Sequence, residues 1–316
     1  MTPIEFKGGE FAFIDWIRRQ AAGAAERLLV GPGDDACVID PGSGGVSVTT
    51  DMLLEGTHFD LAKVTPREVG WKAIGVGLSD IAAMGTEPIA CVAAVGLPES
   101  SDRAFAEALY EGMRDLADRF DVPIAGGDVT SWTAPHVVIC VTALGRSTGA
   151  EPVLRSGARP GDVIVVTGSL GGSLLGRHVR FIPRVNEALV ICREYAPHAM
   201  IDLSDGLSSD LAHVAVESKV GALIEEKLVP ISPDAEEASG TDGRPSIAHA
   251  LDDGEDFELL VTLDEADALR LVKDCPFDAR LTAIGNVTDT GEIFIRDNDG
   301  NVRQLEPGGY EHLRGT

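Results

Sequence analysis

Aspartates stand at strand ends and in glycine turns throughout this chain of 316 residues. The segments concerned are Gly33-Asp34-Asp35, Thr49-Thr50-Asp51, Gly126-Gly127-Asp128, Asp202-Leu203-Ser204-Asp205 and Gly254-Glu255-Asp256. A solvated helix face would instead repeat its acidic residues every three or four positions. Carboxylates that follow buried strands are typical of a shared binding site.

Asp80 differs from these residues because we expect it inside a helix that begins near Pro66. At helical spacing Asp80 shares a face with Ala73 and Val76, and the neighbouring face is also apolar. We therefore expect Asp80 to be buried, and an isolated buried carboxylate is costly unless it has a partner. For any single aspartate that partner can be an arginine or a lysine, and the sequence leaves this open.

The set of carboxylates as a whole favours a metal ion, because few arginines stand near the same segments. Two carboxylates about 4 Å apart repel by roughly 4 kcal/mol at an effective dielectric constant of about 20, and a divalent cation removes that repulsion. Oxygen ligands in glycine turns favour Mg²⁺ or Mn²⁺ over zinc. Magnesium held by a few carboxylates usually also binds phosphate, so the residues alone predict a Mg²⁺–phosphate site.

The phosphate-binding part of such a site matches neither the Walker loop nor the protein-kinase motifs, which this sequence lacks. The segment Asp205-Gly206-Leu207 joins an expected strand to an expected helix, where amide N–H groups can meet phosphate. Ordinary capping of that helix by Ser204 or Asp205 explains the same residues equally well. The spacing therefore leaves both interpretations open.

The order of the expected elements indicates two α+β lobes rather than a simple alternating βαβ series. We expect helices over residues 11–20, 66–84, 101–120, 172–179, 185–195, 207–218 and 264–273. We expect strands over residues 46–50, 89–97, 122–125, 137–144, 163–167, 200–203, 220–225, 257–262, 282–287 and 293–296. Glycines and prolines over residues 146–161 indicate a boundary, and residues 234–245 are expected to form a polar surface loop.

The composition excludes several classes of protein. The formal net charge of −25 argues against partners that are nucleic acids or anionic membranes. The sequence contains no apolar run long enough for a transmembrane helix and no evident signal peptide. The cysteines are widely spaced (Cys37, Cys91, Cys140, Cys192 and Cys275), which argues against a zinc site or a disulfide framework and favours a cytoplasmic location.

An ordered set of short motifs resembles the thiamine-monophosphate kinase family, part of the superfamily that includes aminoimidazole ribonucleotide synthetase. The motifs are Gly9-Glu10-Phe11, Gly33-Asp34-Asp35-Ala36, Thr49-Thr50-Asp51, Gly56-Thr57-His58-Phe59, Leu78-Ser79-Asp80-Ile81-Ala82-Ala83-Met84-Gly85, Gly126-Gly127-Asp128, Arg155-Ser156-Gly157, Ile201-Asp202-Leu203-Ser204-Asp205-Gly206-Leu207, Gly254-Glu255-Asp256-Phe257-Glu258-Leu259 and Gly309-Tyr310-Glu311-His312. The resemblance implies an α+β, two-lobed, synthetase-like fold. Its N-terminal lobe, residues 1–148, would carry a mixed sheet that binds ATP and Mg²⁺ and dimerises, and residues 149–316 would form a C-terminal α/β sandwich.

The same resemblance implies ATP-dependent phosphorylation of thiamine monophosphate to thiamine diphosphate, by direct transfer with several Mg²⁺ ions, in a homodimer. The metal ligands would be Asp35, Thr49, Thr50, Asp51, Asp80, Asp128, Asp202 and Asp205, with the division of roles between Asp34 and Asp35 left open. ATP would contact Tyr110, Gly127, Asp128, Arg155 and Ser204. Thiamine phosphate would contact His58, Glu255 and Tyr310. No residue is expected to act as a catalytic base.

The chain departs from the family pattern at Gly77, where asparagine is frequent, and at Val129, where threonine is usual. These departures concern peripheral contacts to ATP or substrate. Two alternatives stay open: an ATP-dependent enzyme like aminoimidazole ribonucleotide synthetase, and a non-catalytic homologue that binds nucleotide or thiamine phosphate.

A hydrogenase-maturation protein would be expected to end in cysteine, which does not match the segment from His312 to Thr316. Selenophosphate synthetase would be expected to carry a reactive cysteine in an N-terminal glycine-rich loop, whereas the first cysteine here, Cys37, follows Asp34 and Asp35. The sequence therefore disfavours both.

Overall fold

The computed structural model of this protein describes residues 28–30, 37–39, 45–149 and 151–310. The helix expected over residues 11–20 and the turn that carries Asp34 and Asp35 lie outside the described residues. Glu311 and His312, the last two residues of the motif that begins at Gly309, also lie outside them.

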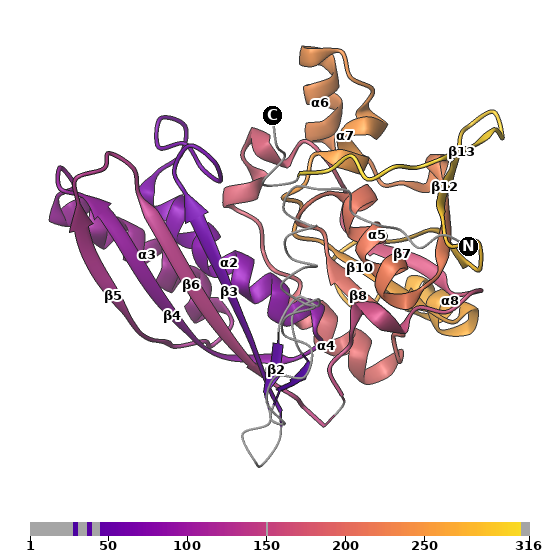
Figure 1. The fold of residues 1–316 in the computed structure, drawn as a ribbon, viewed down its shortest axis with the longest axis horizontal. Helices are drawn as coiled ribbons and strands as arrows, with labels where there is room; N and C mark the ends of the chain where they lie inside the picture. Colours follow the sequence, from indigo (N-terminus) through magenta and orange to yellow (C-terminus); the bar gives the residue numbers. More distant parts are fainter. Residues whose placement is uncertain (1–27, 31–36, 40–44, 150, 311–316) are drawn as a thin grey trace.

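A six-stranded sheet forms the N-terminal part of the molecule, with the strand order β1-β2-β3-β6-β4-β5. The strands are β1 (Leu28–Val30), β2 (Cys37–Ile39), β3 (Val46–Leu54), β4 (Glu87–Pro98), β5 (Ile124–Trp132) and β6 (Val138–Arg146). The sheet is mixed, because β4 and β5 run parallel while the other pairs are antiparallel. Two helices, α2 (Pro66–Ala83) and α3 (Arg103–Arg119), lie together behind this sheet (Figure 1).

Helix α2 begins where the sequence predicts, because Thr65 and Glu68 form a reciprocal capping box and Pro66 occupies the first turn. Its backbone approaches α3 closely through two glycines. A Cβ on Gly70 would lie 2.0 Å from the carbonyl oxygen of Leu109, and one on Gly112 would lie 1.8 Å from that of Arg67. Only glycine permits this contact, which lets α2 and α3 pack side by side against the sheet.

A seven-stranded sheet forms the C-terminal part, with the order β13-β12-β9-β11-β7-β10-β8. Its strands are β7 (Val163–Thr167), β8 (Ala199–Asp202), β9 (Gly221–Glu225), β10 (Leu259–Leu263), β11 (Leu281–Thr288), β12 (Ile293–Arg296) and β13 (Val302–Gln304). The helices are α4 (Val185–Glu194), α5 (Leu207–Ser218), α6 (Pro233–Asp242), α7 (Ser246–Asp252) and α8 (Glu265–Asp274), with short 3₁₀ turns η1 (Arg155–Gly157), η2 (Ser173–Leu175), η3 (Arg177–Val179) and η4 (Glu226–Leu228).

The two sheets share one part of the hydrophobic core. Helix α2 contacts β8 as well as the six-stranded sheet. The apolar cluster around Ile74 and Leu78 also includes Met200 on β8 and Phe257 just before β10. A second cluster around Leu211 and Ile224 lies within the C-terminal part alone. Figure 1 shows α2 between the two sheets, so a residue on α2 can meet side chains from both.

Two sequence-based expectations for the C-terminal part are wrong. Residues 234–245 were expected to form a loop, but Ser232 caps helix α6 through Ala235 N and Pro233 stands in its first turn. The polar composition hid this helix, because only Ala235 is buried along it. Residues 172–179 form the two 3₁₀ turns η2 and η3 rather than one helix, since Gly176 between them has a φ of 137°.

Among the described residues, no helix combines the length and the apolar character that crossing a membrane requires.

Candidate active site

A cavity of about 240 Å³ lies where strand β3 of the six-stranded sheet and helix α2 meet the end of strand β8. Elements from the whole length of the described chain line it. Its acidic lining residues are Asp51, Asp80, Asp202, Asp205, Asp253 and Glu255, and Thr57, His58, Lys72, Ser204 and Tyr310 line it as well. The structure thus places seven predicted site residues that are far apart in sequence around one space, in addition to Ser204.

Asp51 and Asp80 reach this cavity from the two layers of the N-terminal lobe. Asp51 lies on β3 and Asp80 lies in the last turns of α2. The hydroxyl group of Thr49, also on β3, donates a hydrogen bond to the Asp80 carboxylate. Asp80 was expected to be buried, but it is half-buried because it faces the cavity.

Asp202 comes to the cavity from the end of strand β8. It is buried, and its Oδ2 accepts a hydrogen bond of 2.6 Å from the Ser79 hydroxyl of α2. Asp205 follows in the loop before α5, and its carbonyl oxygen accepts a hydrogen bond from Tyr310 N. Tyr310 is therefore fixed to the loop that carries Asp205 and directly follows Asp202.

Asp210 of α5 does not line the cavity, but it holds the loop that carries Asp205. Its Oδ2 accepts hydrogen bonds of 3.1 Å from both Asp205 N and Gly206 N. Burial, followed by the nearby charges of Asp205 and Asp202, raises the pKa of Asp210 well above its usual value, and Arg155 opposes that shift. Asp205 precedes helix α5, which begins at Leu207, so the Asp210 side chain reaches back from the first turn of the helix to this loop.

Gly206 is the N-cap of α5, so the interpretation that Ser204 or Asp205 caps this helix is wrong. Gly206 has a φ of 110°, which favours glycine, and this conformation turns the chain sharply between Asp205 and the helix. The turn leaves the Asp205 and Ser204 side chains at the cavity wall.

His58 and Tyr310, two of the predicted substrate residues, lie at the same cavity. His58 Nδ1 accepts a hydrogen bond of 3.0 Å from Leu54 N, so in the neutral ring the proton sits on Nε2. Tyr310 has 48% of its surface exposed, which leaves its ring accessible to a flat ligand.

Glu255, the third predicted substrate residue, forms a buried salt bridge that the sequence analysis missed. Lys72 Nζ on α2 lies 2.5 Å from Glu255 Oε2, and the Lys72 side chain is only 1% exposed. Burial raises the pKa of Glu255 and lowers the pKa of Lys72, while their mutual attraction opposes both shifts. The signal available in the sequence was a lysine within an otherwise apolar helix.

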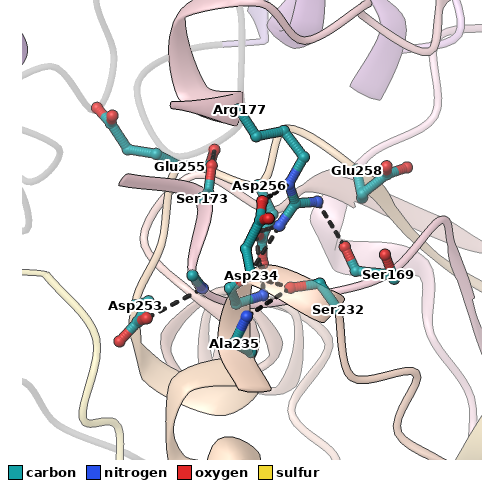
Figure 2. A network of polar contacts seen from close by, with 12 residues as sticks. Ser169, Ser173, Arg177, Ser232, Asp234, Ala235, Asp253, Glu255, Asp256 and Glu258 are labelled. Carbon is teal, nitrogen blue, oxygen red and sulfur yellow. Dashed lines mark hydrogen bonds and ion pairs between the residues drawn. The ribbon is translucent and has the colours of Figure 1, made fainter. Parts of the chain in front are cut away.

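The backbone around Glu255 is held in an unusual conformation. Gly254, Glu255 and Phe257 all have positive φ values, of 71°, 54° and 50°. Asp256 between them is buried and accepts hydrogen bonds from Gly171 N and from Arg177 Nη2, the latter at 2.9 Å. Figure 2 shows this network, in which Arg177 spans from Asp256 to the carbonyl oxygen of Ser169.

Asp128, Gly127 and Tyr110 line a second cavity of about 440 Å³ beside β5 and α3. In the sheet, Asp51 pairs with Val141, which lies in one row with Ala93 and Gly127. Three strand spacings, roughly 14 Å, therefore separate Asp51 from this part of β5. Within one chain, Asp128 is too far from Asp51 to bind the same ion.

Thr50 and Arg155 lie outside the lining of the first cavity. The Thr50 hydroxyl bonds to Val141 O and Thr142 on the neighbouring strand. Arg155 belongs to η1, where its carbonyl oxygen accepts a hydrogen bond of 2.7 Å from the Ser218 hydroxyl of α5. Its charge nevertheless acts on Asp210, as the pKa of that carboxyl shows.

The donor set of the first cavity fits magnesium better than a transition metal. It consists of oxygen atoms, and among the described side chains no three acidic, histidine or cysteine groups are clustered as a preformed metal site. Magnesium typically binds through one or two carboxylates, water and substrate phosphate rather than in a protein cage. Carboxylates spread around a cavity suit that mode of binding.

A family model described as AIR synthase related protein, N-terminal domain, matches residues 33–147. This match, together with the two-lobed α+β fold, defines an AIR synthase-like protein and confirms the predicted fold class. A structure of AaThiL complexed with AMPPCP and TMP superposes with a TM-score of 0.82 at 30% sequence identity, covering 96% of this chain and 97% of that one.

Relatives of known name agree with that structural match. A thiamine-monophosphate kinase of Rhodopirellula baltica is 36% identical over 311 residues, which cover 96% of this chain and 97% of that protein. One of Mycobacterium tuberculosis is 39% identical over 275 residues, 80% of each chain. The chain belongs to the thiamine-monophosphate kinase family, as the sequence motifs predict.

Proposed function

We propose that this chain transfers the terminal phosphoryl group of ATP to thiamine monophosphate and so forms thiamine diphosphate and ADP. The observation that carries the proposal is the cavity that Asp51, Asp80, Asp202 and Asp205 line together with His58, Glu255 and Tyr310. Four carboxylates suit metal-bound phosphates, and the other three side chains suit a small heterocyclic acceptor.

The reaction needs positioned positive charge more than a base. Both reacting groups are anionic phosphates, whose approach is opposed by their charge, and a phosphate oxygen of the acceptor is already deprotonated at neutral pH. Asp51, Asp80, Asp202 and Asp205 would hold Mg²⁺, which supplies charge neutralisation and alignment of the phosphates when bound. The role of the protein in phosphoryl transfer would then be to hold these carboxylates in position.

The acceptor contacts follow from side-chain chemistry. Tyr310 offers an exposed ring on which a flat heterocycle can stack, and His58 offers Nε2 as a hydrogen-bond donor. Glu255 can pair with a cationic or amino group of thiamine. We assign these three residues to thiamine phosphate.

ATP is assigned to Tyr110, Gly127 and Asp128 at the second cavity, with Arg155 and Ser204 contributing from the C-terminal lobe. Glycine is required at position 127, because a Cβ there would lie 1.9 Å from the carbonyl oxygen of Ala93. This close approach leaves only backbone at the surface of β5, which a nucleotide can contact directly. Asp128, Thr49, Thr50 and Asp35, which lies outside the described residues, complete the proposed metal ligands. Within one chain Asp128 would bind a different Mg²⁺ ion from Asp51.

A homodimer is part of this proposal because one face of the N-terminal sheet is open. Helices α2 and α3 lie on the other face, while eight of the nine residues of edge strand β5 are exposed. Met52 of β3 lies on this open face in one row with Cys140, Ala94 and Asp128, and it is 58% exposed. A second copy that joined this face would cover the apolar side chains and the exposed strand edge. We also propose that the boundary between the two lobes lies at about residue 148. The proposed location of the protein is the cytoplasm.

The test is an assay of ADP formation by the full chain with Mg²⁺, ATP and a panel of acceptors. We expect turnover with thiamine monophosphate and none with unphosphorylated thiamine or with no acceptor. Removal of Mg²⁺ with a chelator should abolish turnover. Binding of thiamine monophosphate without ADP formation would favour the non-catalytic alternative and overturn the proposal.

A further inference from the structure

Lys72 stands out because it is the only lysine or arginine among the described residues that line the first cavity. Six carboxylates line the same space. The Lys72 side chain is 1% exposed, although lysine is almost never fully buried unless it is paired. A buried charge at this position therefore needs specific partners, and the structure provides two.

The two partners of Lys72 belong to different parts of the molecule. Its Nζ donates a hydrogen bond of 2.6 Å to the carbonyl oxygen of His58, in the loop after β3. It also lies 2.5 Å from Glu255 Oε2, in the loop before β10 and 183 residues further along the chain. One ammonium group thus joins the two loops to which we assign the thiamine phosphate.

Glu255 is fixed from the C-terminal side as well. Its amide donates a hydrogen bond of 2.6 Å to the carbonyl oxygen of Ser204, and its own carbonyl oxygen accepts one of 2.5 Å from the Ser173 hydroxyl. Figure 2 places Glu255 at the end of the network around Asp256 and Arg177. The backbone is therefore held by the C-terminal lobe, while the carboxylate is held by Lys72 of the N-terminal lobe.

We propose that Lys72 is a positioning residue for the acceptor site: it directs the Glu255 carboxylate and the His58 loop into the geometry that binds thiamine phosphate. The inference rests on the proposed function, because it presumes that His58 and Glu255 bind the acceptor. Lys72 acts through Glu255 and the His58 loop and has no direct part in phosphoryl transfer. Its loss should therefore weaken acceptor binding and leave ATP binding unaltered.

The test is a double-mutant cycle of Lys72→Met and Glu255→Gln, with KM measured separately for thiamine monophosphate and for ATP. Lys72→Met should raise the KM for thiamine monophosphate at least tenfold in the wild-type background and by a smaller factor in the Glu255→Gln background, where only its bond to the His58 carbonyl oxygen is lost. The KM for ATP should change less than twofold throughout. Lys63→Met is the control, because the Lys63 side chain is 79% exposed and pairs only with Asp60 at the surface in the described structure.

Lys72→Met leaves the Glu255 charge buried, so this single variant can fail to fold. In that case Lys72→Arg takes its place, since it keeps the charge but moves the donor atoms, and Lys72→Met/Glu255→Gln provides a neutral pair. Equal changes in both KM values would show a merely structural role and overturn the inference. So would an effect of Lys72 substitution that persists undiminished in the Glu255→Gln background. An inactive wild-type chain would instead overturn the proposed function.

Discussion

The Ser79 hydroxyl donates a hydrogen bond of 2.6 Å to Asp202 Oδ2, although 123 residues separate the two in the chain. Both side chains are buried, and they come from different lobes: Ser79 from helix α2 and Asp202 from the end of β8. Ser79 directly precedes Asp80, so the same turn of α2 carries one predicted metal ligand and orients another. The bond fixes the spacing of carboxylates from the two lobes.

Ser79→Ala should destabilise the protein and reduce its activity. Removal of the donor leaves a buried carboxylate oxygen without this hydrogen bond, which costs about 1–3 kcal/mol in the free energy of unfolding. Because Asp202 also loses its orientation, we expect turnover to fall at least tenfold at saturating substrates. Denaturant unfolding and the kinase assay measure the two effects separately.

The control for this variant is Ser100→Ala, which changes an exposed turn residue before α3. It should leave both unfolding free energy and turnover within error of wild type. If Ser79→Ala behaved in the same way, the bond between the lobes would have no role in stability or in the placement of Asp202.

Asp51→Asn tests the proposed metal site. The substitution removes one negative charge from a cavity with six carboxylates but keeps the size of the side chain. We expect the fold to persist, with unchanged or higher stability in the absence of Mg²⁺, because carboxylate repulsion decreases. Phosphoryl transfer should fall by two or more orders of magnitude. Unchanged turnover would remove Asp51 from the site.

The sequence predicts the elements with strong local signals. Helix α2 has a capping box and a proline in its first turn, and the structure confirms that it begins at Pro66. Helix α5 likewise spans Leu207–Ser218 as predicted. The family resemblance, which rests on short motifs in a fixed order, is confirmed by relatives that match almost the whole chain. Local capping and ordered motifs need no knowledge of tertiary contacts.

Pairings between distant segments could not be predicted in this way. Lys72 lies in an apolar helix, and nothing near it in sequence indicates that its partner is Glu255. Asp210 folds back onto the amides of Asp205 and Gly206, which depends on where α5 begins. The position of Asp128 depends on a strand order in which β6 and β4 separate it from β3. Each of these facts belongs to the tertiary fold.

Asp256 should make the stability of the protein depend on pH. Burial raises its pKa from 3.8 to about 7, although Arg177 and the Gly171 amide oppose the shift. Between these two values the folded state keeps the proton that the unfolded state has lost, so stability from this group falls as pH rises. The slope is at most about 1.4 kcal/mol per pH unit, and it ends above pH 7.

Asp256→Asn removes this titration, while the other carboxylates affect both proteins equally. The difference in unfolding free energy, wild type minus variant, should therefore decrease from pH 5 to pH 7 and stay level above that. Denaturant titrations of both proteins at several pH values measure it. Parallel curves over the whole range would contradict a raised pKa for Asp256.

The open sheet face predicts that a charge at its centre prevents dimer formation. Ala94 on β4 is exposed and pairs in register with Cys140 and Asp128. Ala94→Glu would bury an unpaired charge in the proposed interface, which costs about 3 kcal/mol or more and weakens the dimer over 100-fold. Sedimentation velocity should show a monomer, whereas Leu269→Glu, on exposed helix α8, should leave the dimer intact. A dimer that survives Ala94→Glu must use another surface.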